Sequence, residues 1–278
     1  MTTAAPTRVT SLELAADTLT PVAAALRLGE RCAFLLESVE GGARYGRYSI
    51  AGVHGRTLIV RDGDGDPLEV LRRALPEVEP MAGDPAFPLA SGVGYLAYEA
   101  AAGWERLPVP PTDPLEMPDA VFHLPSSVIV FDHLAQVARV ATLEGPGARE
   151  RLDEVARTLS SPAEGEVPAT FAAAVVPKEI DPAARIRYER GVAQLVAEIH
   201  AGEMLQTVLA RRFSVPTRRS AIEIYRSLRR INPSPYLYYL DLAAVAPGAA
   251  VVGASPELLV RVRDGEVVTR PIAGTRPR

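Results

Sequence analysis

The chain contains 278 residues, and its contents of 47% hydrophobic and 23% charged residues are typical of a globular protein with a buried core. Its formal net charge of −4 excludes the basic excess that nucleic-acid-binding domains show, so we expect no nucleic-acid partner. Cys32 is the only cysteine, which excludes a disulfide within the chain, argues against a thiolate metal site and is typical of the reducing cytoplasm.

The sequence predicts no membrane segment and no secretion signal. Residues 1–19 mix charged residues among short apolar stretches, so they lack the continuous apolar region of a signal peptide. The most apolar window, residues 242–254, is broken by Pro247 and Gly248 and is too short to span a bilayer. We therefore expect no membrane partner.

In the first half of the chain, short apolar runs between turn residues predict strands. These strands are expected at residues 33–36, 48–53, 57–60, 92–98, 128–131 and 137–142, the last two as a hairpin, with a turn at 62–65. The proline-rich stretch 108–125 is expected to be an ordered loop, because proline limits regular structure. A helix is expected at 148–159 and a linker at 160–170.

The second half begins with a predicted helix that has Asp181 as its N-cap and ends at Gly202. Ser220 and Glu223 match a capping box for a further helix at 221–231. Strands are expected at 206–215, 236–242, 251–252, 258–263 and 266–270, with Asp264-Gly265 as a hairpin turn. Hairpin-connected strands with helices inserted in batches predict an α+β fold with antiparallel sheets, divided into domains 1–165 and 166–278.

Two familiar kinds of site are disfavoured by context. The run Gly92-Val93-Gly94-Tyr95-Leu96-Ala97 matches a loose dinucleotide fingerprint, but it does not open a helix after a buried strand. Its glycines are more consistent with a strand that another backbone approaches closely. The four histidines are scattered without metal-ligand spacing, so we expect them on the surface or in turns.

Three short segments have both a structural and a functional interpretation. Glu37 and Ser38 end an apolar strand, either as a solvated strand end or as a small pocket in which the carboxylate meets an ammonium group. The run Asn232-Pro233-Ser234-Pro235-Tyr236 is either a stiff connection or a rigid ligand wall. Glu257 lies in an apolar strand region, where it either faces outward or is desolvated, and desolvation would raise its pKa and suit a general acid.

These segments occur together, and in the same order, in one known family. The shared runs are Glu37-Ser38, Gly41-Gly42-x-x-x-Gly46-Arg47-Tyr48-Ser49, Gly202-Glu203-x-x-Gln206-x-Val208-Leu209-x-x-Arg212, Asn232-Pro233-Ser234-Pro235-Tyr236, Gly253-x-Ser255-Pro256-Glu257 and Pro271-Ile272-Ala273-Gly274-Thr275-Arg276. On these motifs, essentially the whole chain resembles anthranilate synthase component I, a chorismate-utilising enzyme.

The resemblance implies catalytic roles for a few residues. It assigns Glu257 as the general acid on the leaving hydroxyl of chorismate, and Gly274 and Thr275 as substrate contacts. Water-using relatives place a lysine base where this chain has Gln206, so ammonia is the implied nucleophile. Aminodeoxychorismate synthases place a lysine nucleophile where this chain has Ala273, and an alanine cannot form that covalent intermediate. The implied products are anthranilate and pyruvate.

The resemblance also implies a tryptophan feedback pocket, a metal and a partner. The pocket would be lined by Glu37, Ser38, Asn232, Pro233, Pro235, Tyr236 and Leu237. Mg²⁺ would hold the substrate carboxylate, with ligands expected beyond Arg278, and a glutamine amidotransferase subunit would supply ammonia. The chain is therefore expected to be the N-terminal portion of a cytoplasmic lyase and to be inactive alone.

Three alternatives stay open from the sequence. The first is a 2-amino-2-deoxyisochorismate synthase, which shares Gln206 and Ala273 but does not eliminate pyruvate. The second is an aminodeoxychorismate synthase sibling. The third is a non-catalytic, truncated paralogue that keeps the tryptophan pocket as a binding module.

Overall fold

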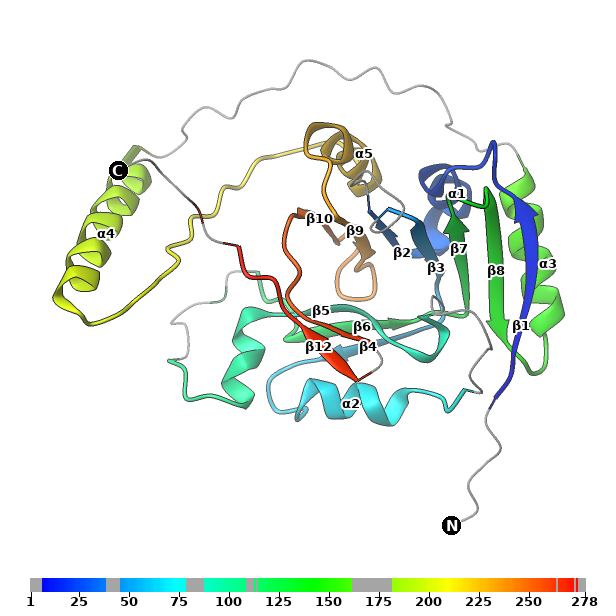
Figure 1. Ribbon diagram of the computed structural model, residues 1–278, viewed down its shortest axis with the longest axis horizontal. Helices are drawn as coiled ribbons and strands as arrows, with labels where there is room; N and C mark the ends of the chain where they lie inside the picture. The colour runs from blue at the N-terminus through cyan, green and yellow to red at the C-terminus, as the bar shows by residue number, and fades with distance from the viewer. Residues whose placement is uncertain are drawn as a thin grey trace, which may run out of the picture. The chain divides into compact units, whose positions relative to one another are not determined.

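A computed structural model describes residues 7–38, 46–78, 88–108, 113, 115–161, 182–263, 265–272 and 274 (Figure 1). Its strands are β1 (Val9–Ala15), β2 (Cys32–Glu37), β3 (Tyr48–Val53), β4 (Arg56–Val60), β5 (Val93–Leu96), β6 (Ala120–Leu124), β7 (Ser127–Asp132), β8 (Val137–Leu143), β9 (Tyr236–Asp241), β10 (Ala250–Ser255), β11 (Arg261–Arg263) and β12 (Glu266–Val268). Its α-helices are α1 (Pro21–Leu28), α2 (Pro67–Ala74), α3 (Ala148–Ser160), α4 (Pro182–Ala201) and α5 (Ala221–Ile231), with short 3₁₀ turns η1 (Gly29–Arg31), η2 (Pro88–Ala90) and η3 (Tyr98–Gly103).

The chain forms two compact units, one of residues 1–168 with 220–278 and one of residues 169–219. The first unit contains a seven-stranded sheet in the order β1-β8-β7-β3-β2-β9-β10. Neighbouring strands of this sheet are antiparallel throughout, as are the pairs in the two smaller sheets β4-β6-β5 and β11-β12. The α+β prediction with antiparallel sheets is confirmed.

Both faces of the seven-stranded sheet are covered. Helices α1, α3 and α5 pack on one face, where Leu35, Phe131 and Leu237 contribute to a shared core with Leu152 and Tyr225. On the opposite face, Phe34, Val130 and Leu240 pack with residues of η2 and β5. Because neither face is left to solvent, strands such as β7 are almost entirely buried rather than alternating between buried and exposed.

The three-stranded sheet depends on a close backbone contact at Gly94. A Cβ atom placed on Gly94 would lie 1.7 Å from the carbonyl oxygen of Val121 on β6. This closeness explains the glycine in a strand, as the sequence indicated. Helix α2 packs its apolar side on this sheet, and Asp66 caps the helix by accepting a hydrogen bond from the Leu68 amide.

Replacing Gly94 by alanine is expected to destabilise the fold by about 2–4 kcal/mol, because the backbone of β5 and β6 must separate to admit the methyl group. Urea denaturation measures the change in the free energy of unfolding. Gly103→Ala is the matched control, since a Cβ atom there meets nothing within 4 Å. Equal stability of the two variants would show that the sheet accommodates the methyl group easily.

Two expected secondary-structure assignments differ from the structure. The stretch 108–125 is not all loop, because residues 120–124 form β6, the buried centre of the three-stranded sheet. Residues 206–215 form no strand, because nothing among the described residues pairs with them. The division into domains 1–165 and 166–278 stays a prediction, and strands β9 and β10 of the second predicted domain extend the sheet that β1–β3, β7 and β8 begin.

The second unit consists of α4 and the extended segment that follows it. Gly202 ends α4 with a positive φ of 86°, as the sequence predicts. At Gly191 the helix has no side chain, and Leu209 approaches so closely that a Cβ atom would lie 2.9 Å from its Cδ2 atom. Several apolar side chains of α4, including Val192 and Val196, are exposed. In the described part of the chain, no helix combines the length and apolar character needed to cross a membrane.

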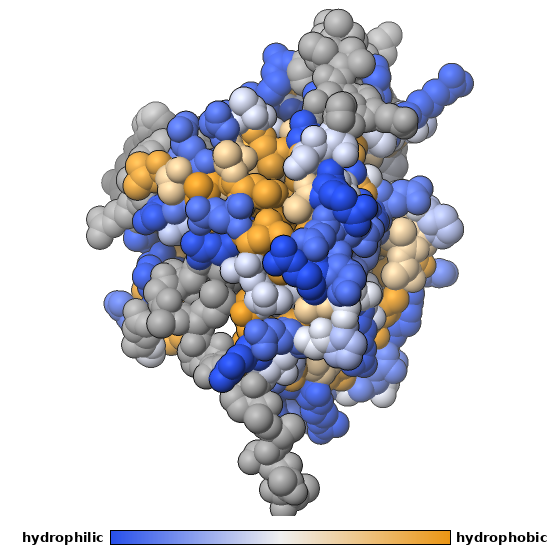
Figure 2. Space-filling model, turned by 90° about the vertical axis from the view of Figure 1, so that its right-hand side faces the viewer, coloured by the Kyte–Doolittle hydropathy of each residue, from blue (hydrophilic) through white to orange (hydrophobic). Residues whose placement is uncertain are grey.

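Apolar side chains also reach the surface elsewhere. On the face seen in Figure 2 they gather in a patch with hydrophilic side chains around it. Large exposed apolar side chains occur in several described segments, among them Tyr98, Leu134, Leu205 and Leu259. Nothing among the described residues covers these four side chains.

Two histidines, His54 and His123, lie where the seven-stranded and three-stranded sheets meet. The burial of His123 differs from the expectation that all four histidines lie on the surface or in turns. His123 on β6 is 2% exposed, and its Nδ1 atom lies 3.1 Å from the Thr57 hydroxyl. The ring of His54 meets it edge-on, and the Nε2 atom of His54 lies 3.0 Å from the carboxylate of Asp241 on β9. Burial, and then the charge of His54, lower the pKa of His123, while Asp241 acts in the opposite direction.

This burial predicts a loss of stability in mild acid. The lowered pKa of His123 means that the unfolded chain takes up a proton near pH 6.5 before the folded chain does. The free energy of unfolding should therefore fall by up to about 1.4 kcal/mol per pH unit as the pH drops below that value. Urea denaturation between pH 7.5 and 5.5 measures this slope.

His123→Gln should reduce the slope, and His200→Gln, which changes an exposed residue of α4, should leave it as in the wild type. An unchanged slope in the His123 variant would contradict this account of the acid sensitivity.

Candidate functional site

The ends of three neighbouring strands meet beneath helix α5. In the register of the sheet, Glu37 at the end of β2 lies opposite Leu237 on β9, which lies opposite Ala254 on β10. Leu237 and Ala254 belong to the core on the side of α5, and Glu37 contacts the same helix. The strand pairing therefore brings residues from distant parts of the sequence into one row across the sheet. We call Glu37, Leu237 and Ala254 the Glu37 row.

Glu37 is a buried carboxylate with two partners on α5. The residue is 5% exposed, and its Oε2 atom accepts a hydrogen bond of 2.6 Å from the hydroxyl of the fully buried Tyr225. Burial, followed by the charge of Glu37, raises the pKa of Tyr225, so this side chain stays protonated and donates. The solvated strand end that the sequence left open is excluded.

The second partner is Arg229, one helical turn after Tyr225. Its Nε atom lies 3.0 Å from Oε2 of Glu37, so the two charges form an ion pair. The Nε atom is not aligned to donate a hydrogen bond, and it is buried without an acceptor. The hydroxyl of Ser38, the next residue along the chain, is also buried without a hydrogen-bond partner among the described residues. A buried polar atom without a hydrogen-bond partner is uncommon and calls for an explanation, and a bound polar ligand is one.

The segment between α5 and β9 borders the same place. Asn232 is the C-cap of α5, and its backbone carbonyl accepts a hydrogen bond of 3.2 Å from the buried Ser234 hydroxyl. Tyr236, the first residue of β9, is 37% exposed, whereas Leu237 is buried. Pro233 is exposed and Pro235 half-buried, as in a rigid connection at the rim of the row.

Glu257 follows β10 and is held in a tight turn. The Ser255 hydroxyl accepts a hydrogen bond from the Glu257 amide and donates one to the Glu257 carbonyl. The hairpin β11-β12 then returns the chain, so that the Ile272 amide donates a hydrogen bond of 2.8 Å to Oε1 of Glu257. Gly274, two residues later, is exposed. The hydrogen bond thus joins Glu257 to Ile272, which lies two residues before Gly274.

The desolvation considered for Glu257 is not observed. Its side chain is exposed among the described residues, and it lies in the first compact unit. Gln206 is also exposed, and it lies in the second unit. Thr275 and Ala273 lie outside the described residues. The catalytic roles of Glu257 and Gln206 therefore stay predictions.

Comparison with known proteins identifies the family. The family model for chorismate binding enzymes matches residues 32–278. The chain belongs to this family. In both sequence and structure, the chain is similar to anthranilate synthases.

Two sequence relatives and one crystal structure show this similarity. Anthranilate synthase component 1 of Thermus thermophilus is 41% identical over 95% of this chain and 59% of its own length. The protein of that name from Streptomyces coelicolor is 38% identical over 94% of this chain and 53% of its own length. The crystal structure of anthranilate synthase component I from Streptococcus pneumoniae matches with a TM-score of 0.68 and 26% identity, covering 91% of this chain and 59% of that one. The chain thus spans a little over half the length of these relatives.

The part of the chain that the structure describes contains no candidate metal site. No group of three or more His, Cys, Asp or Glu side chains lies close enough there to hold a metal ion. The described residues thus do not fit a Mg²⁺ ion on their own, and none of them is assigned a role in binding one.

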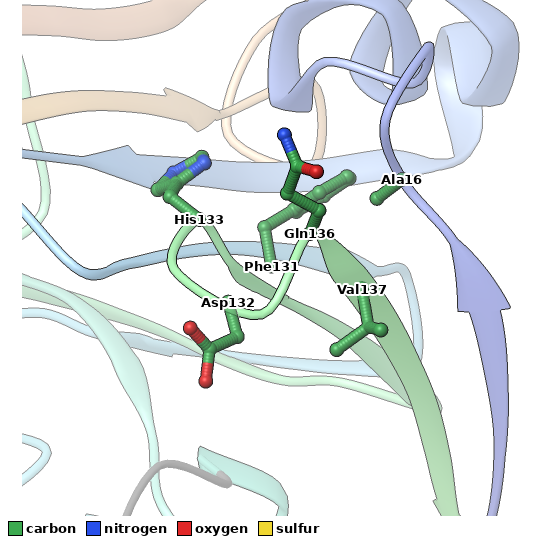
Figure 3. Close-up of a pocket in the computed structure, with 6 residues that line it drawn as sticks. All are labelled: Ala16, Phe131, Asp132, His133, Gln136 and Val137. Carbon is green, nitrogen blue, oxygen red and sulfur yellow. The ribbon is translucent and has the colours of Figure 1, made fainter.

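A small hollow lies beside the turn between β7 and β8 (Figure 3). It has a volume of ≈ 100 Å³ and is lined by Ala16, Phe131, Asp132, His133, Gln136 and Val137. The Nε2 atom of His133 lies 2.8 Å from the Ser49 hydroxyl. Arg47 pairs with Asp132 and lowers the pKa of its carboxyl. This volume is well below the 300–1,000 Å³ typical of ligand pockets, and the side chains of Asp132 and His133 already have partners in Arg47 and Ser49, so we interpret the hollow as structural.

The sequence analysis missed Tyr225 and Arg229. A signal existed, because the two residues are four apart on a helix whose capping box is recognisable, and residues four apart share a helical face. What the sequence could not supply is that this face meets Glu37, which lies 188 positions before Tyr225. The contact arises from the pairing of β9 with β2.

Proposed function

We propose that the complete polypeptide is the large subunit of an anthranilate synthase, which converts chorismate and ammonia to anthranilate and pyruvate. One observation carries the proposal: relatives with 41% and 38% identity that align with 95% and 94% of this chain are both anthranilate synthases. The place of the reaction in tryptophan biosynthesis follows from this assignment.

Two side chains have proposed roles in this reaction. Glu257 is the proposed general acid that protonates the departing hydroxyl of chorismate, a type of step that contributes about 10²–10⁴-fold to the rate. Gln206 carries an amide, which has no basic nitrogen to deprotonate water, so the proposed nucleophile is ammonia. Gly274 and Thr275 are the proposed substrate contacts.

The proposed effector is L-tryptophan, bound at the Glu37 row. The buried carboxylate of Glu37 suits the ammonium group of an amino acid, and the unpaired Ser38 hydroxyl offers a further polar contact. Asn232, Pro233, Pro235, Tyr236 and Leu237 are the proposed walls. A glutamine amidotransferase subunit is the proposed source of ammonia, Mg²⁺ the proposed metal, and the cytoplasm the proposed location.

Product analysis tests the proposal. The complete polypeptide is incubated with chorismate, Mg²⁺ and either ammonium or glutamine, and anthranilate is measured by its fluorescence and mass. We expect anthranilate and pyruvate with ammonium, and turnover with glutamine only when an amidotransferase subunit is added. Release of 2-amino-2-deoxyisochorismate without pyruvate would instead establish the 2-amino-2-deoxyisochorismate synthase, and release of its 4-amino isomer would establish the aminodeoxychorismate synthase.

A further inference from the structure

The buried carboxylate of Glu37 already has a cation beside it. The side chain of Glu37 is 2% exposed, and the guanidinium of Arg229 lies within ion-pairing distance of its Oε2 atom. The hydrogen bond from Tyr225 falls on the same oxygen, and among the described residues Oε1 has no hydrogen-bond partner. The chain therefore supplies a counter-ion for Glu37 from its own helix α5.

Two features of Arg229 make this counter-ion easy to displace. Its Nε atom is close to Oε2 but misaligned for a hydrogen bond, so the pair lacks the geometry that makes ion pairs strong. Its side chain is 38% exposed, so the guanidinium can move toward water, whereas Glu37 is enclosed. Tyr225, which is fully buried and donates a hydrogen bond, would keep the carboxylate in place when Arg229 leaves.

We propose that Arg229 is a resident competitor at the effector pocket, which an ammonium-bearing ligand displaces from Glu37. The inference rests on the proposed amino-acid pocket and specifies how that pocket is regulated. A second cation beside Glu37 is repelled by Arg229 while the ion pair persists, so ligand binding requires the pair to open. The affinity for the ligand is therefore set by how much more favourably Glu37 interacts with the ammonium group of the ligand than with the guanidinium of Arg229.

The displacement also links the pocket to the rest of the unit. Helix α5 packs on β9 and β10, and β10 leads through Ser255 into the turn that holds Glu257. Release of Arg229 removes one of the two contacts that tie α5 to Glu37 and leaves the contact from Tyr225. Opening of the ion pair is therefore the local change through which an effector acts on α5.

Titration calorimetry at pH 8 on the complete polypeptide tests the proposal, with L-tryptophan and indole-3-propionate as probes. Indole-3-propionate keeps the indole and carboxylate but has no ammonium group. Arg229→Gln should bind tryptophan about 3- to 10-fold more tightly than the wild type, while its affinity for indole-3-propionate should not increase. The matched control is Arg226→Gln, which removes the same charge from the same helix without touching Glu37 and should leave both affinities unchanged.

Arg229→Lys restores a cation and should return the affinity for tryptophan to within about twofold of the wild type. Denaturation midpoints confirm that each variant is folded. An Arg229→Gln variant that binds tryptophan no more tightly than the wild type would overturn the inference and leave the pocket intact. Absence of tryptophan binding in both wild type and Arg229→Gln would instead overturn the pocket itself. Tryptophan binding by Arg229→Gln, with none detectable in the wild type, would also support the inference.

Discussion

Replacing Glu257 by glutamine is expected to lower kcat for anthranilate formation by about 10²–10⁴-fold, because an amide is too weakly acidic to protonate the departing hydroxyl. The substitution preserves shape. The amide oxygen can still accept the hydrogen bond from the Ile272 amide, and the turn made by the Ser255 hydroxyl involves only the backbone of residue 257. The loss should therefore fall on the chemical step rather than on folding.

Steady-state kinetics on the complete polypeptide, with ammonium and chorismate at saturation, measure this effect. The control is Glu266→Gln, which neutralises an exposed carboxylate in the hairpin after Glu257 and should leave kcat unchanged. Tryptophan affinity should be the same in both variants, because Glu257 is not in the Glu37 row. If kcat of the Glu257 variant stayed within a few-fold of the wild type, another group would have to be the general acid.

The second large effect is expected at Glu37. Glu37→Gln should raise the Kd for tryptophan by at least about 100-fold, because an enclosed charge-assisted hydrogen bond to an ammonium group loses its negative partner. Glutamine has nearly the volume of glutamate, and its carbonyl oxygen can still accept the hydrogen bond from Tyr225. The fold should accordingly be retained.

Calorimetry and tryptophan inhibition of anthranilate formation give two measures of this change. Glu30→Gln, at an exposed position of η1 just before β2, is the control and should bind tryptophan normally. The substitution at Glu37 should leave kcat in the absence of tryptophan nearly unchanged. A Kd within about threefold of the wild type would place the effector elsewhere.

Local signals predicted much of the fold. The capping box at Ser220 and Glu223, the hairpin of β7 and β8 and the strand β3 were all recognisable, because short-range hydrogen bonding and apolar patterning determine them. The helices α1 and α2 were missed although each has a polar N-cap followed by proline, at Thr20 and Asp66. Their short length left little periodicity to detect.

The errors came from segments whose structure depends on partners. Strand β6 lies within a proline-rich stretch, but its residues, such as Val121 and Phe122, are buried by pairing with β4 and β5 on either side. Residues 206–215 carry a strand-like apolar pattern, yet a strand needs a neighbour to bind its backbone groups, and the described residues provide none. Propensity alone does not distinguish these two cases.

In the candidate site, too, some residues could be recognised from local sequence, whereas others depend on tertiary contacts. Glu37, Ser38 and Leu237 could be named from their motifs, and the sheet register brings Glu37 and Leu237 side by side. Tyr225 and Arg229 could not be assigned to the site, because their contact with Glu37 exists only once α5 packs on β9 and β10. Sequence motifs therefore indicated the carboxylate of the proposed pocket, and the structure added the two side chains of α5 that contact it.

The identity of the nucleophile is the most direct test of the proposed reaction. The complete polypeptide is given chorismate and Mg²⁺, with [¹⁵N]ammonium in one sample and no nitrogen source in the other, and the products are identified by mass spectrometry. We expect ¹⁵N-labelled anthranilate in the first sample and unreacted chorismate in the second. Formation of isochorismate or salicylate without nitrogen would contradict the assignment, because it would mean that the enzyme activates water.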